Sequence, residues 1–404
     1  MNKKKLMILG GHYYLKPLIK KAHELGLYVI TVDYLPDNPA HKYSDEYHNV
    51  SVIDKEVVLS LAKQLNINGI ISFVNDVAVV TAAYVAEKMN LPFQCSYEAA
   101  KILQDKGLFR EFLSRNGFNV PCAKRYSNKS DPLSDINYFN WPVIVKPTDA
   151  AGSKGVTKVN SPDELSQAID VAMAGSLSNT FIIEDFLTFD GFHSSADLFT
   201  IDGKLEFVSF TDQLFDDKAP NPYSPTCIIW PTTMKTENQN YLSNEIQRLF
   251  NLLQVKNGIY NIETCVGKNA KPYIMEISPR GGGCRIAEIQ KRIYNVDLIE
   301  KEIRQAVGMT VDSISQEEIN GCWCEMVVIP YENQQGTYYG YNINEEVLNN
   351  YVKFIDIYFP IGAQIKTEPG KNITLGDIFL CTSTRDELNF LLNNKQDWLT
   401  IDIR

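Results

Sequence analysis

Apolar strands alternate with helices through the first hundred residues of this chain. The apolar runs are continuous rather than alternating, so each strand is expected to be buried on both faces. Continuous apolar strands separated by helices are typical of a parallel sheet with helices on both sides. We therefore predict a Rossmann-like α/β domain over about residues 1–120. Its strands are expected at 5–9, 27–32 and 69–74, and its helices at 17–25, 56–65 and 76–89.

The pattern changes near Trp141, where strands become shorter and turns more frequent. Two alternating stretches surround the turn Asp202-Gly203 and predict an antiparallel pair. We predict a two-lobed α+β body over 121–310 and a β-rich C-terminal segment over 311–404. Further strands are expected at 142–147, 155–159, 181–184, 193–200, 205–210, 258–266 and 272–277, and helices at 97–117 (with Gly107 as a break), 238–253, 286–294, 298–307 and 385–393.

Composition limits the partners that this chain can have. Its formal net charge is -10, and its basic block is Lys3-Lys4-Lys5, so we expect neither nucleic-acid binding nor attraction to anionic membranes. No apolar run is long enough to span a bilayer. The eight cysteines are scattered except for Cys322 and Cys324, which favours reduced thiols in the cytoplasm. Small-molecule substrates are expected, with a homodimer as the default assembly.

Two glutamates lie in neighbouring apolar strands. Glu263 belongs to the strand at 258–266 and Glu276 to the strand at 272–277, and a short turn joins the two. Antiparallel pairing would place both carboxylates side by side on one face. Such carboxylates repel each other unless a cation lies between them, and Mg²⁺ bound to nucleotide phosphates is a common answer. The alternative is that both glutamates simply face solvent.

Basic and glycine-rich segments flank these glutamates in sequence. Arg280 and three glycines follow the second strand, where close backbone approach and a bidentate guanidinium would suit a phosphoryl group or a carboxylate. Lys146 ends an apolar strand, and its charge requires a partner such as a phosphate. The loop at 149–155 contains two glycines and predicts a flexible flap whose N–H groups cover phosphates.

Together these motifs resemble the ATP-grasp superfamily, in the branch that includes biotin carboxylase, glycinamide ribonucleotide synthetase, carbamoyl-phosphate synthetase halves and amino-acid ligases. The resemblance covers about Lys5 to Gly308, and its motifs follow the family's order. They are Asp105-Lys106 with Phe109-Arg110 and Gly117 to Pro121, Pro142 to Pro147, Gly152 to Gly155, Ile182 to Leu187, Glu263, and Glu276 to Gly283. The resemblance implies a two-lobed ATP-grasp fold that holds ATP with Mg²⁺ (or Mn²⁺) between its lobes.

The resemblance also implies which residues hold the nucleotide. Lys106 and Lys146 would contact the α- and β-phosphates, and the loop Gly152-Ser153-Lys154-Gly155 would close over the β/γ end. One segment would bind the adenine: the Glu184 side chain would accept from the adenine amino group, and the backbone of Asp185 and Leu187 would contact the adenine edge.

By the same resemblance, residues of the second lobe would bind the metal and the transferred phosphoryl group. By resemblance, Glu263 and Glu276 would hold magnesium, and Arg280 would stabilise the transferring phosphoryl group or the acyl phosphate, with Lys146 as a second catalytic cation. Ser278 stands where the family usually has asparagine, and its hydroxyl could still ligate or support the metal. His193 falls near the family's usual ribose-binding glutamate; it either donates to the ribose or is an ordinary strand residue.

Several other positions allow two interpretations each. Gly10-Gly11-His12 could help to form the substrate site, or with Asp33 could form a dinucleotide fingerprint, although the third glycine is missing. Asp76 could line the substrate pocket, but capping of its helix is favoured. Arg285 could hold a substrate anion or be a surface arginine. Residues 212–226 could form a mobile loop over the site.

We expect an ATP- and Mg²⁺-dependent ligase that activates a carboxylate as an acyl phosphate for attack by an amine or a similar nucleophile. One alternative is phosphorylation of bicarbonate, as in the carboxylase and carbamoyl-phosphate branches. A second is an ATP-binding regulatory protein without catalysis, and a hydride-transfer enzyme is more distant.

Overall fold

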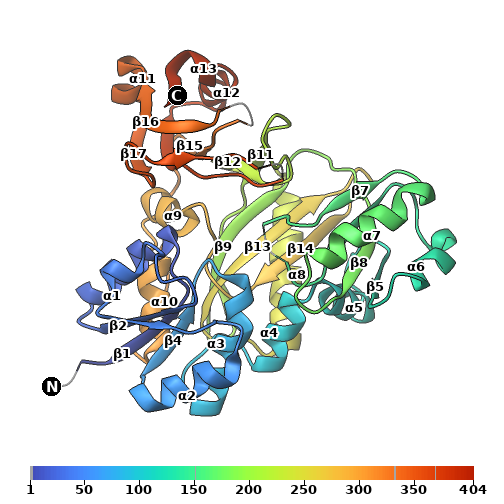
Figure 1. The fold of residues 1–404 in the computed structure, drawn as a ribbon, viewed down its shortest axis with the longest axis horizontal. Coiled ribbons are helices and arrows are strands. Elements are labelled where there is room, and N and C mark those ends of the chain that lie inside the picture. The colour runs from blue at the N-terminus through green and yellow to red at the C-terminus, as the bar shows by residue number, and fades with distance from the viewer. Residues whose placement is uncertain (1–2, 151, 332–333, 369) are drawn as a thin grey trace.

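A parallel sheet of order β3-β2-β1-β4 forms the N-terminal part of the chain in the computed structural model, which describes residues 3–150, 152–331, 334–368 and 370–404. Side chains of β1 alternate between two cores, because Leu6 and Ile8 face one side of the sheet and Met7 and Leu9 face the other. Helices α1 and α10 cover the first side, and α2 and α3 the second (Figure 1). The bounds are β1 (Lys5–Leu9), β2 (Tyr28–Asp33), β3 (Glu46–Asn49), β4 (Gly69–Ser72), α1 (Lys16–Glu24), α2 (Lys55–Leu65), α3 (Asp76–Met89) and α10 (Leu298–Ala306).

Two helices lead from this sheet into the first lobe of the body. The predicted helix at 97–117 is divided into α4 (Tyr97–Gln104) and α5 (Lys106–Arg115), and the division falls at Asp105 rather than at Gly107. The Asp105 side chain accepts a hydrogen bond from the Leu108 N–H and so caps α5. The first lobe itself is an antiparallel sheet, β5-β8-β6-β7, packed against α7. Its elements are β5 (Ala123–Tyr126), α6 (Asp131–Ser134), β6 (Val143–Pro147), β7 (Thr157–Val159), α7 (Leu165–Ala174) and β8 (Phe181–Asp185).

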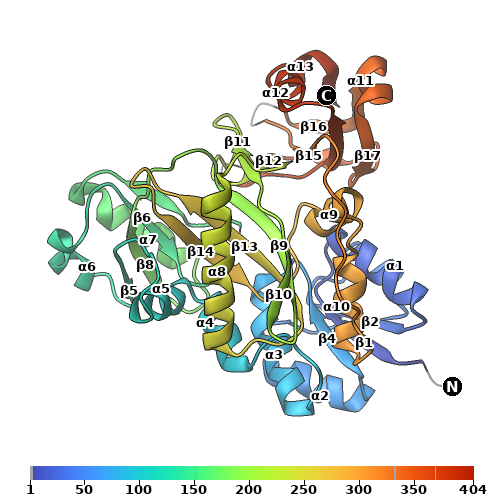
Figure 2. The same cartoon turned by 180° about the vertical axis from the view of Figure 1, so that it is seen from behind.

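The second lobe is the antiparallel sheet β10-β9-β13-β14. One face packs on α8 (Thr236–Leu253), which lies in front of the sheet in the view of Figure 2. Tyr260 and Ile262 of β13 enter that core, so Asn261 and Glu263 project from the opposite face. The strands are β9 (Ser194–Ile201), β10 (Lys204–Val208), β13 (Gly258–Val266) and β14 (Pro272–Ser278), as predicted to within a few residues.

The C-terminal part shares a sheet with the body. The five-stranded order β11-β12-β15-β19-β17 joins two strands from residues 212–230 to three strands from the C-terminal hundred residues. The predicted loop at 212–226 therefore starts and ends in strands. The remaining elements are β11 (Asp212–Phe215), β12 (Pro225–Trp230), α9 (Ile286–Tyr294), β15 (Cys322–Val328), β16 (Gly336–Ile343), α11 (Glu345–Asn350), β17 (Val352–Ile357), β18 (Gln364–Ile365), β19 (Gly376–Thr382), α12 (Arg385–Asn393), α13 (Lys395–Trp398) and β20 (Leu399–Ile403).

The predicted mixture of α/β and α+β architecture is confirmed, and the domain boundaries at 120 and 310 stay a prediction. Across the described residues, none of the helices combines the length and the apolar character that a membrane span requires.

Candidate active site

A cavity of about 570 Å³ lies between the two lobes of the body. Residues of β6, β8, β13 and β14 contribute to its wall, together with the loops at 150–156 and 222–225. Aromatic residues gather around His193, whose ring centroid lies 3.9 Å from that of Phe189 and 5.8 Å from that of Phe215. The charged residues of the wall are Asp76, Lys106, Arg110, Lys146, Lys154, Glu184, Asp185, Glu263, Glu276 and Arg280.

Glu263 and Glu276 are direct partners across β13 and β14, and both line the cavity. The predicted placement on one face is therefore confirmed. Burial and the neighbouring Glu276 raise the pKa of Glu263 to about 7. Burial opposes ionisation of Glu276 as well, but Lys106, whose Nζ lies 3.2 Å from Glu276 Oε2, outweighs it and lowers the pKa. The two carboxylates are therefore expected to share one proton, or to bind one additional cation, near neutral pH.

This donor set suits a hard divalent cation that completes its shell with other oxygens. Among the described residues there is no group of three His, Cys, Asp or Glu side chains arranged to hold a metal ion. Two carboxylates facing a cavity fit Mg²⁺, which takes one or two carboxylates together with phosphate oxygens and water.

Lys146 and Arg110 hold Glu184 between them. Lys146 Nζ donates to Glu184 Oε1, and Arg110 Nε donates to Glu184 Oε2 at 3.0 Å. Burial disfavours the Glu184 carboxylate, but the two cations outweigh it and lower its pKa to about 2. Burial lowers the pKa of Lys146, which an added phosphate would counteract. Both Glu184 oxygens already accept hydrogen bonds, so its role toward an adenine amino group stays a prediction.

Asp76 binds the arginine that follows the second glutamate strand. Its Oδ1 accepts from Arg280 Nε at 2.7 Å and from the Ser278 hydroxyl at 2.9 Å. The favoured interpretation of Asp76 as a helix cap is wrong: the N-cap of α3 is Asn75, without a side-chain cap bond. Asp76 lines the cavity instead. No local sequence pattern marks this ion pair, because 204 residues separate its partners.

The Ser278 hydroxyl is engaged in hydrogen bonds with other side chains. It donates to Asp76 and accepts from Gln104 Nε2, and the residue is only 1% exposed. Ser278 is also not among the residues that line the cavity. These contacts do not favour the predicted role of Ser278 as a metal ligand.

The segment after β8 and the flap close the wall. The Asp185 N–H donates to the Cys122 carbonyl at 2.8 Å and is therefore engaged within the protein, while Leu187 lines the cavity. His193 also lines it, and burial and Lys146 lower its pKa to about 4, so the ring is neutral. In the flap, Gly152, Ser153 and Lys154 line the cavity, and Gly155 has φ +71°, a left-handed conformation that favours glycine. Ala151 lies outside the described residues.

The flap contacts the loop between β11 and β12. The Ser153 hydroxyl donates to the Tyr223 carbonyl at 3.0 Å, and Asn221 Nδ2 donates to the Gly152 carbonyl at 3.4 Å. Pro222, Tyr223 and Ser224 line the same cavity, so this part of the predicted loop at 212–226 borders the site.

Arg285 corresponds to neither of its two predicted roles. Its side chain is 3% exposed and donates to Glu288 at 2.7 Å, to Tyr358 at 2.9 Å and to Asp377 at 3.2 Å, with Asp356 as a further partner. It is neither a surface arginine nor free to hold a substrate anion. Through Asp356 and Asp377 it links the glycine turn, Gly281 to Gly283, to the C-terminal sheet.

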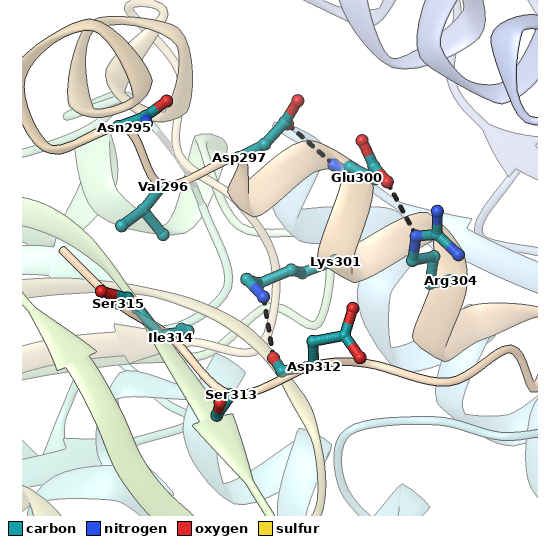
Figure 3. Close-up of a pocket in the computed structure, with 10 residues that line it drawn as sticks. All are labelled: Asn295, Val296, Asp297, Glu300, Lys301, Arg304, Asp312, Ser313, Ile314 and Ser315. Atoms are coloured by element: carbon teal, nitrogen blue, oxygen red, sulfur yellow. Dashed lines mark hydrogen bonds and ion pairs between the residues drawn. The ribbon is translucent and has the colours of Figure 1, made fainter.

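Two further features lie apart from this cavity. Asp33 accepts from Leu35 N and Asn38 Nδ2 within its own loop and does not line the cavity. A separate pocket of about 320 Å³ lies beside α10 (Figure 3). Its two basic side chains are already paired, Lys301 with the Asp312 carbonyl and Arg304 with Glu300. Neither feature adds a group to the site between the lobes.

Comparison with known sequences identifies the domain around the cavity. Residues 139–288 match the family described as ATP-grasp domain. The carbamoyl phosphate synthase large chain of Thermotoga petrophila is 24% identical over 340 residues, which are 78% of this chain and 30% of that protein. This chain thus spans about a third of that relative. The formate-dependent phosphoribosylglycinamide formyltransferase of Prochlorococcus marinus subsp. pastoris is 23% identical over 86% of this chain and 87% of its own length.

Solved structures have the same fold. An L-amino acid ligase from Bacillus licheniformis superposes with a TM-score of 0.80 at 20% identity, over 100% of both chains. The biotin carboxylase domain of a Hydrogenobacter thermophilus 2-oxoglutarate carboxylase, solved as a dimer with MgADP, gives 0.76 at 15% identity and covers 99% of this chain and 91% of that one. The sequence match and the shared fold coincide on the two lobes that enclose the cavity, and residues 139–288 form an ATP-grasp domain.

Proposed function

We propose that this chain binds ATP with Mg²⁺ between its lobes and activates a carboxylate for attack by an amine or a similar nucleophile. The observation that carries the proposal is the side-by-side pair Glu263 and Glu276, with Lys106, Lys146 and Arg280 around the same cavity. Two carboxylates and three cations match the charge of a metal-bound triphosphate.

The residues divide between the two ends of the proposed nucleotide. The aromatic group around His193 would hold the base and ribose, and Lys106 and Lys146 would bind the α- and β-phosphates. When bound to Glu263 and Glu276, magnesium would neutralise charge on the β- and γ-phosphates. Arg280 would face the γ-phosphoryl group and the acid, oriented by its ion pair with Asp76.

The proposed reaction has two steps. A carboxylate oxygen attacks the γ-phosphorus, which forms an acyl phosphate and ADP; the amine then attacks the acyl carbon, which releases inorganic phosphate and forms the C–N bond. The acyl phosphate must be protected from water, and the contacts between the flap and residues 216–224 would close the site during this interval.

The test is ATP-dependent ADP release with a panel of amino acids and hydroxy acids, with hydroxylamine added to trap an acyl phosphate as hydroxamate. Acid-dependent ADP release together with hydroxamate supports the proposal. Turnover with bicarbonate alone would instead support the carboxylase-type reaction. Nucleotide binding without turnover on any acid would support a regulatory ATP-binding protein.

Metal binding is expected to release a proton near neutral pH. The raised pKa of Glu263, about 7, means that the pair holds a proton below this pH and that the metal must displace it. Affinity for Mn²⁺ in the presence of a nonhydrolysable ATP analogue should fall about tenfold per pH unit below about 7 and level off above it. Calorimetry in two buffers of different ionisation enthalpy measures the released proton. An affinity that is constant from about pH 5.5 to about pH 8.5 would contradict the shared-proton pair.

The proposal also includes small-molecule substrates in the cytoplasm and a homodimer, since symmetric dimers are the commonest oligomers. Light scattering after size exclusion tests the assembly.

A further inference from the structure

We infer that Asn261 supplies the third protein oxygen to the metal held by Glu263 and Glu276, a role that Ser278 does not fill. This inference rests on the proposed function and adds a residue to that site. It starts from the two strands that carry the glutamates. On β13, only Asn261 and Glu263 are partly exposed, and every other residue of the strand is buried. Both line the cavity between the lobes.

The strand register places Asn261 at the right level of the sheet. Asn261 is the direct partner of Ser278, just as Glu263 is the direct partner of Glu276. Since residues two apart on a strand share a face, Asn261 and Glu263 project into the same space. An oxygen ligand that Ser278 could have offered from β14 can therefore come from the opposite position on β13.

Hydrogen bonds settle which way the Asn261 amide points. Its Nδ2 donates to Asp197 Oδ1 at 3.0 Å and to the Ala196 carbonyl at 3.3 Å. A main-chain carbonyl only accepts, so the reversed amide would set two oxygens against each other. The glycine turn packs on the same side, because a Cβ at Gly282 would lie 2.5 Å from Asn261 Nδ2. The amide nitrogen is thus anchored in the protein, and no described residue donates to Oδ1.

Asp197 is the anchor of this arrangement. It is fully buried on β9, and its Oδ1 accepts from both Asn261 Nδ2 and the Gly282 N–H, the latter at 2.8 Å. One oxygen therefore fixes the amide and the turn that leads away from Arg280. The oriented amide costs no further ordering when a cation arrives.

A neutral oxygen suits this metal better than a third carboxylate. Glu263 and Glu276 already face each other across β13 and β14, and another anion beside them would add to their mutual repulsion. Mg²⁺ takes neutral amide oxygens as well as carboxylates, and an uncharged ligand leaves room for the negative phosphates.

The test compares matched variants by metal binding rather than by turnover. Mn²⁺ binding to the full chain with a nonhydrolysable ATP analogue is followed by the EPR signal of free Mn²⁺. Asn261→Ala should weaken binding about tenfold, as expected for the loss of one oriented ligand, while Ser278→Ala should change it less than about twofold. Equal effects of the two variants, or no effect of Asn261→Ala, would overturn the inference.

A direct measurement guards against misfolding of the variant. Protein labelled with carbon-13 at the asparagine side-chain carbonyl should show a carbon–manganese coupling by ENDOR that Asn261→Ala removes. Absence of this coupling while the wild type binds Mn²⁺ and nucleotide would overturn the inference alone. If the wild type binds no Mn²⁺ with nucleotide, the proposed function itself fails.

Discussion

Replacing Glu276 with glutamine should reduce acid-dependent ADP formation by about a thousandfold. The variant loses one of two carboxylates that face each other across β13 and β14, and it leaves Lys106 without its partner at 3.2 Å. Removal of a metal ligand at a site of phosphoryl transfer forfeits several kcal/mol of charge stabilisation, and about 4 kcal/mol corresponds to about a thousandfold in rate. The measurement is kcat/KM for ATP at saturating acid, together with Mn²⁺ binding.

Glu237→Gln is the matched control for this substitution. Glu237 is exposed in the first turn of α8 and should retain full activity when changed. A Glu276→Gln variant with more than about a tenth of wild-type kcat/KM would place the metal elsewhere, since a loss below about 1.4 kcal/mol is too small for a lost ligand.

Arg285→Met should destabilise the folded protein by about 3–5 kcal/mol, the range expected when one partner of a buried ion pair is removed. Arg285 is 3% exposed, and its guanidinium faces Glu288, Asp356 and Asp377. Methionine fills a similar volume, so most of the loss should come from carboxylates that remain buried without their cation. Thermal and urea unfolding, followed by circular dichroism, measure the change.

Arg292→Met is the control for this loss, because Arg292 lies in the last turn of α9, the helix that begins directly after Arg285. Arg292 is exposed and lies over the rings of Phe354 and Phe379, at 5.2 and 5.9 Å from their centroids. Its replacement should cost no more than about 1 kcal/mol, the value of an exposed cation–π contact. Similar losses in both variants would mean that the pairing of Arg285 adds nothing to stability.

The fold was predictable where the apolar pattern of a strand is clear. It was not predictable where a strand is polar or belongs to a sheet formed with distant segments of the chain. β1, β2 and β4 are continuous apolar runs, and both glutamate strands were found within a residue or two. β3 was missed because its residues, Glu-Tyr-His-Asn, carry no apolar pattern at the edge of the sheet. The composition of residues 212–226 predicts a loop where β11 lies; β11 pairs with β12, and β12 in turn pairs with β15, about a hundred residues further along the chain.

One part of the candidate site, the pair Glu263 and Glu276, was predictable because the two strands that carry it are neighbours in sequence. A short turn sets the register of Glu263 against Glu276, so the sequence alone predicts their contact. Asp76 with Arg280, and Arg110 with Glu184, are joined by folding across 204 and 74 residues, and no local pattern marks such partners. The orientation of Asn261 depends on Asp197, another distant partner.

The five-stranded sheet at the C-terminal end has a consequence for any attempt to shorten this chain. A fragment that stops near residue 310 would keep every charged group of the cavity, yet β12 would lose its neighbour β15 and expose a row of unsatisfied N–H and C=O groups. Buried Ile228 and Trp230 would lose much of their cover at the same time. Such a fragment would retain the charged residues of the cavity but carry an unpaired strand edge next to them. We therefore expect it to self-associate through β12 rather than to remain monomeric.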